Sequence, residues 1–507
     1  MVGWRVAKSA RVMPPRARQA GSVYVQVDRR AAQPLQRQIA DGLRAAIGAG
    51  RLAPGTRLPG TRSLAVALEV SRTTVALAIE ALIVEGFAVA RARSGVFVAD
   101  EPPRTPRAMT VDSDAGGARR DGSALRLARA AYAAQRRVAA NEVTPRPVAF
   151  ALARPALDLF PIEVWNRLMA RRAARTTIAQ LDYNAESTAL QVAIAGLVSA
   201  ARGMRVVPEQ VLLVGGGQRA IELAAAAVVA PGDRVIVEDP GYPGARHGFA
   251  AAGGQIVARP VDRDGLIVDG LPRARLVYVT PSCQYPLGVT MSLARRQALL
   301  AWAARTGACI VEDDDDSELR FEGAPLPALA ALDRGGRVLY VGSFSRTMFP
   351  AIRLGYLISP LALIEPLRAV RVLRADPMPS LTQLALADFI AGGHYVHHVR
   401  RMRGVYRARR DELCSAAAAA GLVIRVAEAG LHAICELPRG RDANAICAAA
   451  GARGVEVVTV ASFHARGRAA PALVLGFGVA SPRRIRAAMA ILGEVVAKAK
   501  PEGSGRG

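Results

Sequence analysis

From residue 148 to about residue 497 the chain alternates short apolar runs with longer stretches of helical character. Buried strands separated by helices indicate a mostly parallel sheet that is covered by helices on both faces. Ligands of such sheets bind beyond the carboxyl ends of the strands. We therefore expect an α/β fold whose functional site lies where the apolar runs end. The expected strands are Val211–Val214, Val235–Val237, Leu276–Thr280, Cys309–Val311 and Val338–Val341.

Polar segments follow these runs and could together bind a phosphorylated aromatic ligand. Gly216, Gly217 and Gln218 stand between a strand and a helix, where free backbone N–H groups at the positive helix end suit a phosphate. Asp313 could pair with a pyridinium nitrogen, and Tyr242 could stack on the ring. Each signal alone is weak, because a glycine triplet is usually a turn and an isolated aromatic is usually part of a core. Further donors are expected from Ser343, Ser345 and Arg353.

The first hundred residues have the pattern of a helix-turn-helix followed by a hairpin. A helix opens at Pro34, a second covers Leu64–Leu68, and a third begins after the N-cap Ser71 and runs to about Val84. Two helices joined by a tight turn, with a hairpin after them, predict a winged helix-turn-helix. The hairpin strands are expected at Val89–Arg91 and Val96–Val98.

The charge of this segment and the start of its third helix both favour DNA as a partner. Residues 1–100 carry fifteen Lys and Arg against six Asp and Glu, and the first turn of a recognition helix faces phosphates and base edges in the major groove. The alternative is an ordinary helical bundle whose arginines serve solubility. The expected DNA-contacting residues are Arg62, Ser71, Arg72, Thr73, Thr74, Arg93, Ser94 and Gly95.

Composition predicts four segments in the chain and argues against a metal site and a membrane span. We expect a basic extension over residues 1–32, a winged helix-turn-helix over 33–99, a Pro- and Arg-rich linker over 100–147, and an α/β domain over 148–500. The five cysteines lack the spacing of a disulfide framework or a zinc site, so no metal is expected. The apolar stretches are shorter than a membrane span, which predicts a cytoplasmic protein without a membrane partner. If the protein binds DNA, it is also expected to be nucleoid-associated.

Residues 34–98 closely resemble the GntR type of winged helix-turn-helix. One position departs from the pattern, because Ala76 stands where some members carry a further DNA-contacting arginine. The resemblance therefore implies DNA binding without implying a particular base preference. The motifs that carry it are Leu58-Pro-x-x-Arg62, Val70-Ser-Arg-Thr-Thr-Val75, Leu82-x-x-Glu-Gly86 and Ser94-Gly-x-Phe-Val98.

Nearly all of residues 148–490 resemble the fold-type I pyridoxal-phosphate aminotransferases, and specifically the MocR-type regulators that fuse such a domain to a GntR-type reader. The resemblance implies a three-layer domain with a large part over about 148–370 and a smaller C-terminal α/β subdomain over about 371–500. It also implies a homodimer and a pyridoxal-phosphate site. Its motifs include Leu159-Phe-Pro161, Glu238-Asp-Pro-Gly-Tyr-Pro-Gly244, Gln284-Tyr-Pro-x-Gly288, Glu312-Asp-Asp314 and Arg353-Leu-Gly-Tyr356.

Several residues depart from that family pattern. Arg346 follows Phe-Ser where the family has the lysine that binds the cofactor covalently, and a guanidinium cannot act as the amine nucleophile. Asp315 stands in place of a tyrosine that donates a hydrogen bond to the cofactor's phenolate oxygen, and Cys283 replaces a histidine. Val474 occupies the place of a carboxylate-binding arginine. A covalent pyridoxal phosphate and catalytic residues are therefore not expected.

These observations predict a DNA-binding transcriptional regulator whose aminotransferase-like domain serves dimerisation and effector sensing. A second hypothesis is a regulator that binds pyridoxal phosphate noncovalently through Asp313, Tyr285 and the phosphate site, and the third is an active aminotransferase. In the first case a buried acid cluster needs another cation. We expect Arg346 to lie across the place of the ring and to pair with Asp315 or Asp313, with a bidentate geometry available. The alternative is an arginine that turns outward to solvent.

Overall fold

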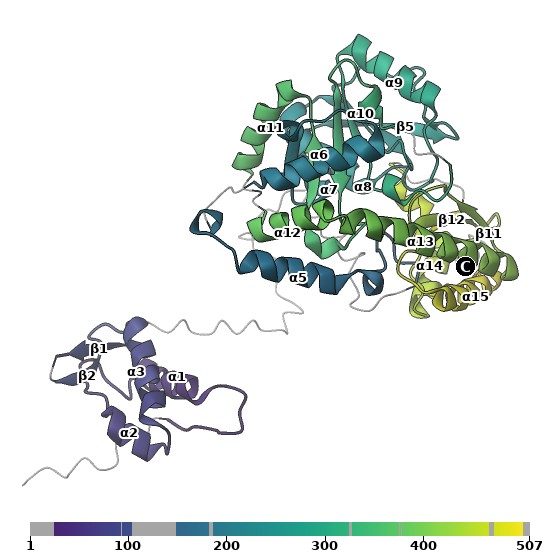
Figure 1. The fold of residues 1–507 in the computed structure, drawn as a ribbon. Coiled ribbons are helices and arrows are strands. Elements are labelled where there is room, and N and C mark those ends of the chain that lie inside the picture. Colours follow the sequence, from purple (N-terminus) through teal and green to yellow (C-terminus); the bar gives the residue numbers. More distant parts are fainter. Residues whose placement is uncertain are drawn as a thin grey trace, which may run out of the picture. The chain divides into compact units, whose positions relative to one another are not determined.

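The computed structural model describes residues 25–92, 94–103, 149–181, 186–323, 327–374, 376, 378–465 and 471–499. The chain forms two compact units, an amino-terminal unit over Met1–Arg126 and a carboxyl-terminal unit over Leu127–Gly507, and Figure 1 shows their elements. Most of the expected basic extension, nearly all of the expected linker, and Arg93 lie outside the described residues.

The amino-terminal unit is a three-helix core with a hairpin. Its elements are α1 (Leu35–Gly48), α2 (Thr61–Ala67), α3 (Arg72–Val84), β1 (Ala88–Arg91) and β2 (Gly95–Val98). Ser71 is the N-cap of α3, because its hydroxyl oxygen accepts a hydrogen bond from the Thr74 backbone N–H at 3.0 Å. Leu43, Leu64 and Leu82 are buried between the helices. The predicted winged helix-turn-helix is confirmed.

Among the described residues the large sheet of the carboxyl-terminal unit has eight strands. These are β3 (Val211–Val214), β4 (Arg234–Asp239), β5 (Gln255–Asp262), β6 (Gly265–Leu266), β7 (Leu276–Val279), β8 (Cys309–Asp313), β9 (Val338–Ser343) and β10 (Gly355–Ile358). Their order is β3-β10-β9-β8-β7-β4-β5-β6. The strands β5, β4, β7, β8 and β9 are mutually parallel, whereas β10 runs antiparallel to both of its neighbours and β6 to β5. The predicted mostly parallel sheet is confirmed.

Helices cover both faces of this sheet and make three layers. On one face Leu212 and Val214 pack with α7 (Gly217–Val228), α8 (Pro243–Ala251) and α11 (Leu361–Leu373). On the other face Val211 and Leu213 pack in a cluster that includes buried residues of helices α6 and α12. The alternation of neighbouring residues between the two clusters is that of a strand buried on both faces. The second face carries α5 (Ile162–Ala173), α6 (Thr188–Arg202), α9 (Leu293–Thr306), α10 (Leu329–Leu332) and α12 (Ser380–Ala391).

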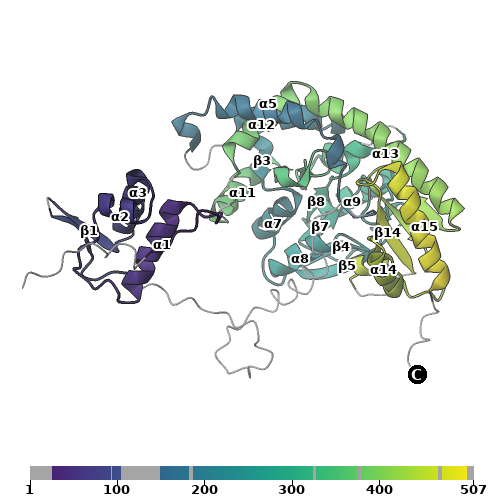
Figure 2. The same ribbon diagram turned by 90° about the horizontal axis from the view of Figure 1, so that it is seen from below.

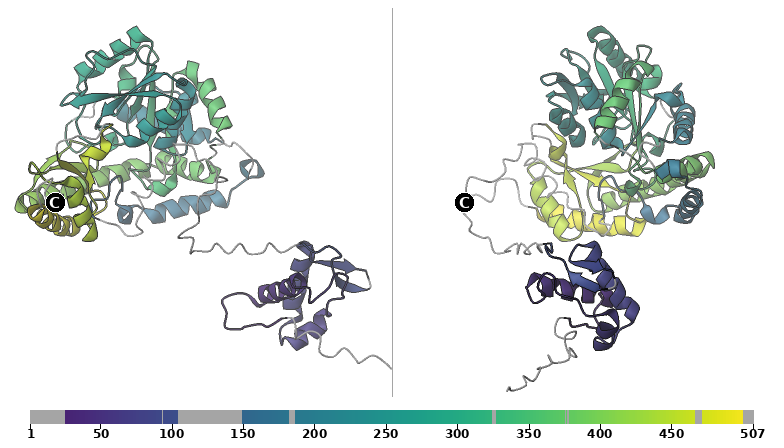
Figure 3. Two further views of the ribbon diagram at one scale, coloured as in Figure 1. Left: turned by 180° about the vertical axis from the view of Figure 1, so that it is seen from behind. Right: turned by 90° about the vertical axis from the view of Figure 1, so that its left-hand side faces the viewer.

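A second sheet forms the smaller part of this unit. It contains β11 (Val423–Val426), β12 (His432–Glu436), β13 (Val458–Thr459) and β14 (Ala472–Gly476), which pair antiparallel in the order β11-β12-β14-β13. Its helices are α13 (His394–Ala419), α14 (Ala443–Ala452) and α15 (Pro482–Lys498). Figure 2 shows α13 and α15 side by side, and Figure 3 shows α15, in yellow, from two further sides.

The boundary between the two parts differs from the expected one near residue 371. Residues Ala385 and Phe389 of α12 are buried with the large sheet, whereas Phe150 is buried with the C-terminal strands and forms a bridge with Gly476. The smaller part therefore contains residues from both ends of the unit. The residues around Phe150 belong to it although they precede the first strand of the large sheet.

Two structural findings concern the other expectations from composition. Each of the five cysteines is free, and the described residues contain no group of three or more His, Cys, Asp and Glu side chains placed to hold a metal. Within the described ranges, no helix has both the length and the apolar character that a membrane crossing requires.

Candidate functional site

A pocket of about 690 Å³ opens at the carboxyl ends of the parallel strands of the large sheet. Its lining includes every residue that the sequence predicted for a cofactor site, so the predicted convergence of the strand ends is confirmed. We call it the strand-end pocket. These lining residues are Gly216, Gly217, Gln218, Tyr242, Tyr285, Asp313, Asp315, Ser343, Ser345, Arg346 and Arg353.

One end of the pocket, its anion end, consists of hydrogen-bond donors. Gly216 precedes α7 and has a φ of +105°, a conformation that favours glycine, and α7 begins at Gly217. The first N–H groups of a helix have no partner within the helix, so they are available to an anion at this positive end. The Ser343 and Ser345 hydroxyls and the Arg353 guanidinium belong to residues that line the same pocket. This arrangement suits a phosphate.

A second group of lining residues, the acid end, consists of Asp313, Asp315 and Asp316 together with Arg346. The Arg346 Nε donates to Asp315 Oδ2 at 3.0 Å, and Arg346 Nη1 lies 3.8 Å from Asp316 Oδ1. The Arg346 side chain is 12% exposed, and its guanidinium carbon lies 5.9 Å from the centre of the Tyr285 ring. The predicted pairing of Arg346 with Asp315 is confirmed, and the alternative of an outward arginine is wrong.

The contacts of Arg346 and Asp313 add two details to that prediction. Arg346 makes a single hydrogen bond to Asp315 and spans toward Asp316 rather than forming a bidentate pair. Asp313 is bound instead by the Tyr278 hydroxyl, which donates to Asp313 Oδ2 at 2.6 Å. Burial and the neighbouring Asp315 raise the pKa of Asp313 to about 8, so this carboxyl holds its proton near neutral pH.

Sequence reasoning missed Tyr278 and Asp316 as pocket residues. Tyr278 is the one polar side chain in the apolar run of β7, and the pattern of that run predicts only a buried strand. Asp316 is the last of four consecutive acids. Two features of the sequence could have indicated these residues. One is a tyrosine hydroxyl near the end of an expected strand, and the other is an acidic run that continues past the end of its strand.

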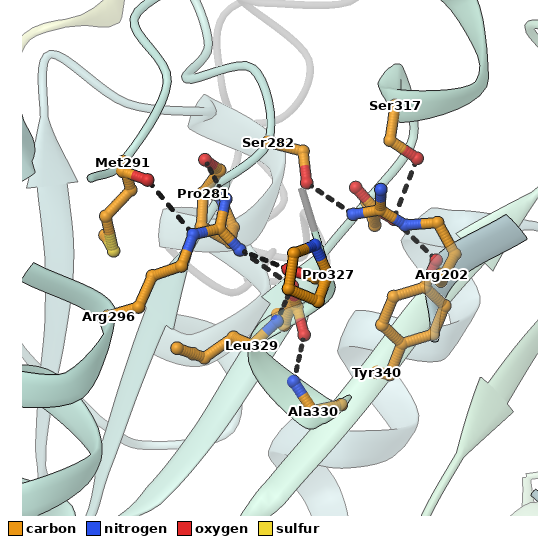
Figure 4. A network of polar contacts seen from close by, with 12 residues as sticks. Arg202, Pro281, Ser282, Met291, Arg296, Ser317, Pro327, Leu329, Ala330 and Tyr340 are labelled. Carbon is orange, nitrogen blue, oxygen red and sulfur yellow. Dashed lines mark hydrogen bonds and ion pairs between the residues drawn. The ribbon is translucent and has the colours of Figure 1, made fainter. Parts of the chain in front are cut away.

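A buried ionic network supports the pocket from behind (Figure 4). The side chains of Arg202 and Asp314 pair at 2.7 Å, from Nε to Oδ2, and the Tyr340 and Ser317 hydroxyls also donate to Asp314 Oδ2. Arg202 additionally donates to the Ser282 hydroxyl at 2.7 Å. The network holds the Asp314 carboxylate and so fixes the position of the segment that carries it, and Asp314 is itself among the residues that line the pocket.

A second arginine, Arg296, lies beside this network in Figure 4. It donates to the backbone oxygens of Met291 and Pro281 at 3.0 and 2.8 Å, and it is 1% exposed. Glu312, one residue before Asp313, accepts hydrogen bonds from the Leu329 and Ala330 backbone N–H groups. The two neighbours of Asp313 in the sequence are therefore both fixed: Glu312 by backbone N–H groups, and Asp314 by Arg202.

Glu238 is a buried acid beside the pocket. The Thr280 hydroxyl donates to Glu238 Oε2 at 2.7 Å, and the Gln284 amide donates to the same oxygen at 3.3 Å. Burial raises the pKa of Glu238 to about 7. The folded state therefore favours the protonated form, and its contribution to stability is full below the unfolded pKa near 4.5 and is lost as the pH rises through about 7.

We expect the free energy of unfolding to fall by on the order of 1–3 kcal/mol from this group between pH 5 and pH 8. Glu238→Gln mimics the protonated carboxyl, so its stability should fall less over the same interval. Urea unfolding at the two pH values measures this, with the exposed Glu209→Gln as the control. Parallel pH profiles for wild type and Glu238→Gln would show that this carboxyl does not titrate on unfolding.

In the amino-terminal unit the described residues that were predicted to contact DNA lie in the first turn of α2, at the start of α3 and in the hairpin. Arg62, Arg72 and Thr73 are exposed, and Arg72 Nε donates weakly to the Thr61 hydroxyl at 3.4 Å. The Ser71 and Thr74 hydroxyls form a hydrogen bond with each other at 2.7 Å, so both take part in the N-cap of α3. Ser94 and Gly95 are exposed in the hairpin turn.

Two further arginines flank the hairpin. Arg57 is exposed and forms a β-bridge with Phe97, and its Nε would lie 3.0 Å from a Cβ placed on Gly95. The Arg91 guanidinium lies 4.8 Å from the centre of the Phe97 ring. Sequence reasoning did not name either residue as a DNA contact. Arg91 lies in β1 itself, whereas the approach of Arg57 depends on how the segment before α2 folds back onto the hairpin.

The comparisons with known proteins agree with this division. Residues 152–490 match the aminotransferase class I and II family, and residues 35–98 match the gntR family of bacterial regulatory proteins. The chain is 37% identical over 468 residues to the probable rhizopine catabolism regulatory protein MocR of Rhizobium meliloti, covering 91% of this chain and 93% of that protein. The chain belongs to the MocR-type regulators of the GntR family.

Two further proteins are similar to this chain over most of its length. The HTH-type transcriptional regulator TauR of Rhodobacter capsulatus is 36% identical over 395 residues, which cover 77% of this chain and 81% of that one. A kynurenine aminotransferase structure from Pyrococcus horikoshii has a TM-score of 0.67 and 25% identity, covering 73% of this chain and 97% of that one. This MocR-type chain is thus a helix-turn-helix DNA-binding regulator whose carboxyl-terminal unit has the fold-type I aminotransferase fold.

The aminotransferase fold implies pyridoxal phosphate, and the strand-end pocket of this MocR-type chain fits it in part. The α7 start and its neighbouring donors fit the phosphate, and Asp313 stands where a ring nitrogen needs an acid. The same pocket holds the Arg346–Asp315 ion pair. The residues present therefore fit noncovalent binding of a phosphorylated ring.

Proposed function

We propose that this MocR-type chain binds its operator as a homodimer and that its carboxyl-terminal unit senses a small effector without a covalent cofactor. Effector sensing without a covalent cofactor is supported most strongly by the buried ion pair of Arg346 with Asp315 inside the strand-end pocket. Exposed Arg62 and Arg72 at the helix-turn-helix support DNA contact. A fold-type I unit that dimerises would present two readers to the DNA.

The lysines of the sequence support noncovalent binding. The chain contains only Lys8, Lys498 and Lys500, and Arg346 follows Phe344-Ser345, where the aminotransferase pattern has its lysine. Arg346 keeps its proton, because burial is outweighed by the charges of Asp316 and Asp315, which raise its pKa further. We infer that the unit is not an aminotransferase.

When bound, pyridoxal phosphate would supply an aromatic ring that carries a phosphate and an electron-withdrawing nitrogen. The helix start at Gly217, with Ser343, Ser345 and Arg353, would hold the phosphate. Asp313 would place a proton at the ring nitrogen, and Tyr242 would contact a ring face. These residues would bind and orient the ligand, so their role would be recognition rather than catalysis.

The experiment that tests the regulatory proposal is selection of duplexes from a random pool by the purified full chain, followed by light scattering. We expect enrichment of a repeated or palindromic site with half-sites about one or more helical turns apart, and a mass of two chains. A pool without enriched sequences would contradict operator recognition, and a stable monomer that binds single half-sites would contradict the dimer.

A labelling experiment tests the proposed absence of a covalent cofactor. After incubation with pyridoxal phosphate and reduction with borohydride, we expect mass spectrometry to find no label between Asp313 and Arg353. Arg346→Lys supplies the positive control, because it places an amine in the pocket and should become labelled there. This variant should still not transaminate, since Asp315 opposes the phenolate oxygen and Val474 cannot hold a substrate carboxylate. A labelled pocket peptide in the wild type would contradict the proposal.

A further inference from the structure

The second turn of the recognition helix α3 exposes apolar side chains, whereas the side of a helix that faces solvent is ordinarily polar. Every residue of α3 is described, and all of residues 75 to 79 are apolar. The residues that α3 buries in the core of its unit are Val75, Ala78, Ile79 and Leu82. Ala76 and Leu77 are exposed, and the exposed fraction of Leu77 is 46%. Packing inside the unit therefore does not explain a leucine at position 77.

Leu77 lies on the same stripe of α3 as Thr73, an exposed residue of the first turn. The two residues are four positions apart, so their side chains are neighbours along one face of the helix. Leu77 is also about half a helical turn away from the buried Val75 and Ile79, which places this stripe opposite the core. The first residues of a recognition helix contact base edges in the major groove. Leu77 therefore follows Thr73 along the face that approaches the bases.

Charged side chains limit the apolar surface at both ends. Arg72 is exposed in the first turn, and its Nε donates to the hydroxyl of Thr61 at the start of α2. Its positive charge suits the phosphates that border the groove. Three positions after Leu77, Glu80 is exposed, and DNA phosphates repel a carboxylate. The closest approach of α3 to the bases therefore lies before Glu80, in the turn that contains Leu77.

We propose that α3 recognises the 5-methyl group of a thymine in the major groove through the side chain of Leu77, with the small Ala76 beside it. This inference rests on the proposed operator recognition and names the base feature that α3 recognises. The methyl group of thymine is the apolar group that the unmodified base pairs present in the major groove. Leucine and alanine side chains neither donate nor accept hydrogen bonds, so they cannot recognise the polar edges of the other bases.

Replacing single thymines of the operator with deoxyuridine tests the inference, because uracil differs from thymine only by the missing methyl group. The operator comes from the selection experiment above, and fluorescence anisotropy gives the affinity of the full chain for each substituted duplex. At one thymine in each half-site, uracil should weaken binding by the wild type about three- to fivefold, which corresponds to one buried methyl group.

Leu77→Ala assigns this effect to Leu77. The variant should bind the unmodified operator about three- to tenfold more weakly than the wild type. Uracil at the same thymine should then change its affinity less than about 1.5-fold, because the methyl group has lost its partner. The salt slope of the variant should equal that of the wild type, since no phosphate contact is removed.

Val84→Ala is the matched control, because it also shortens an exposed apolar side chain of α3. Val84 is 82% exposed and lies beyond Glu80, so we expect the affinity and the uracil response of this variant to equal those of the wild type. Leu77 and Val84 both lie outside the core of the unit, and thermal melting checks that each variant is folded.

The inference is overturned if uracil at no thymine weakens wild-type binding by more than about 1.5-fold, or if the uracil effect is unchanged in Leu77→Ala. Unaltered operator affinity of Leu77→Ala would also overturn it and would assign the exposed leucine to a contact with protein. Operator binding that does not respond to uracil leaves the proposed operator recognition in place. A selection without an enriched sequence would instead contradict the proposed function and overturn this inference with it.

Discussion

Replacing Arg202 with methionine is expected to lower the free energy of unfolding of the carboxyl-terminal unit by about 3–5 kcal/mol. The Arg202 residue is 5% exposed, and its Nε lies 2.7 Å from Asp314 Oδ2 in a side chain that is fully buried. Although burial raises the pKa of Asp314, the Arg202 charge and hydrogen bonds from neighbouring hydroxyls hold that pKa below its usual value. Removing the guanidinium leaves a buried charge without its partner.

Urea unfolding followed by tryptophan fluorescence measures this loss, because Trp165 and Trp302 both lie in the carboxyl-terminal unit. Arg205→Met is the matched control, since Arg205 is exposed three residues away and should change stability by less than 0.5 kcal/mol. Adding Asp314→Asn to Arg202→Met should recover part of the loss, because it removes the unpaired charge. A loss no larger than that of the control would contradict the energetic role of this pair.

Arg72→Ala is expected to weaken operator binding by about 1–3 kcal/mol, or roughly 5–150-fold, if Arg72 contacts a base. Arg72 is exposed in the first turn of α3, the end of a recognition helix that approaches base edges. Its weak hydrogen bond to the Thr61 hydroxyl leaves most of its donors available. A contact to phosphate alone would instead weaken binding to all sequences and lower the salt slope by about one.

Fluorescence anisotropy with operator and scrambled duplexes at several salt concentrations separates these two outcomes. Arg484→Ala removes the same charge from an exposed position on α15, so it controls for net charge. Normal operator binding by Arg72→Ala at moderate salt would show that the predicted orientation of α3 on DNA is wrong.

Local sequence patterns determined the elements of both units. The apolar runs predicted the parallel strands β4, β7, β8 and β9 with ends that differ by at most two residues, since a strand buried on both faces has to be apolar throughout. They did not predict the parallel strand β5, whose residues are only partly buried. Ser71 predicted the start of α3, because the hydrogen bond of an N-cap joins residues that are only three positions apart in the sequence. The convergence of four polar segments on one pocket also followed from the sequence, because parallel strands end at the same edge of a sheet.

Only the tertiary structure decided which acids meet which cations. Strand alternation separates Asp314 from its neighbours Asp313 and Asp315, but its partner Arg202 is more than a hundred residues away. Asp316 leaves the alternation because the chain turns there into a short 3₁₀ helix, which brings its carboxylate back to Arg346. Pairing between distant segments depends on how helices and strands are placed in three dimensions, and local periodicity carries no information about that placement.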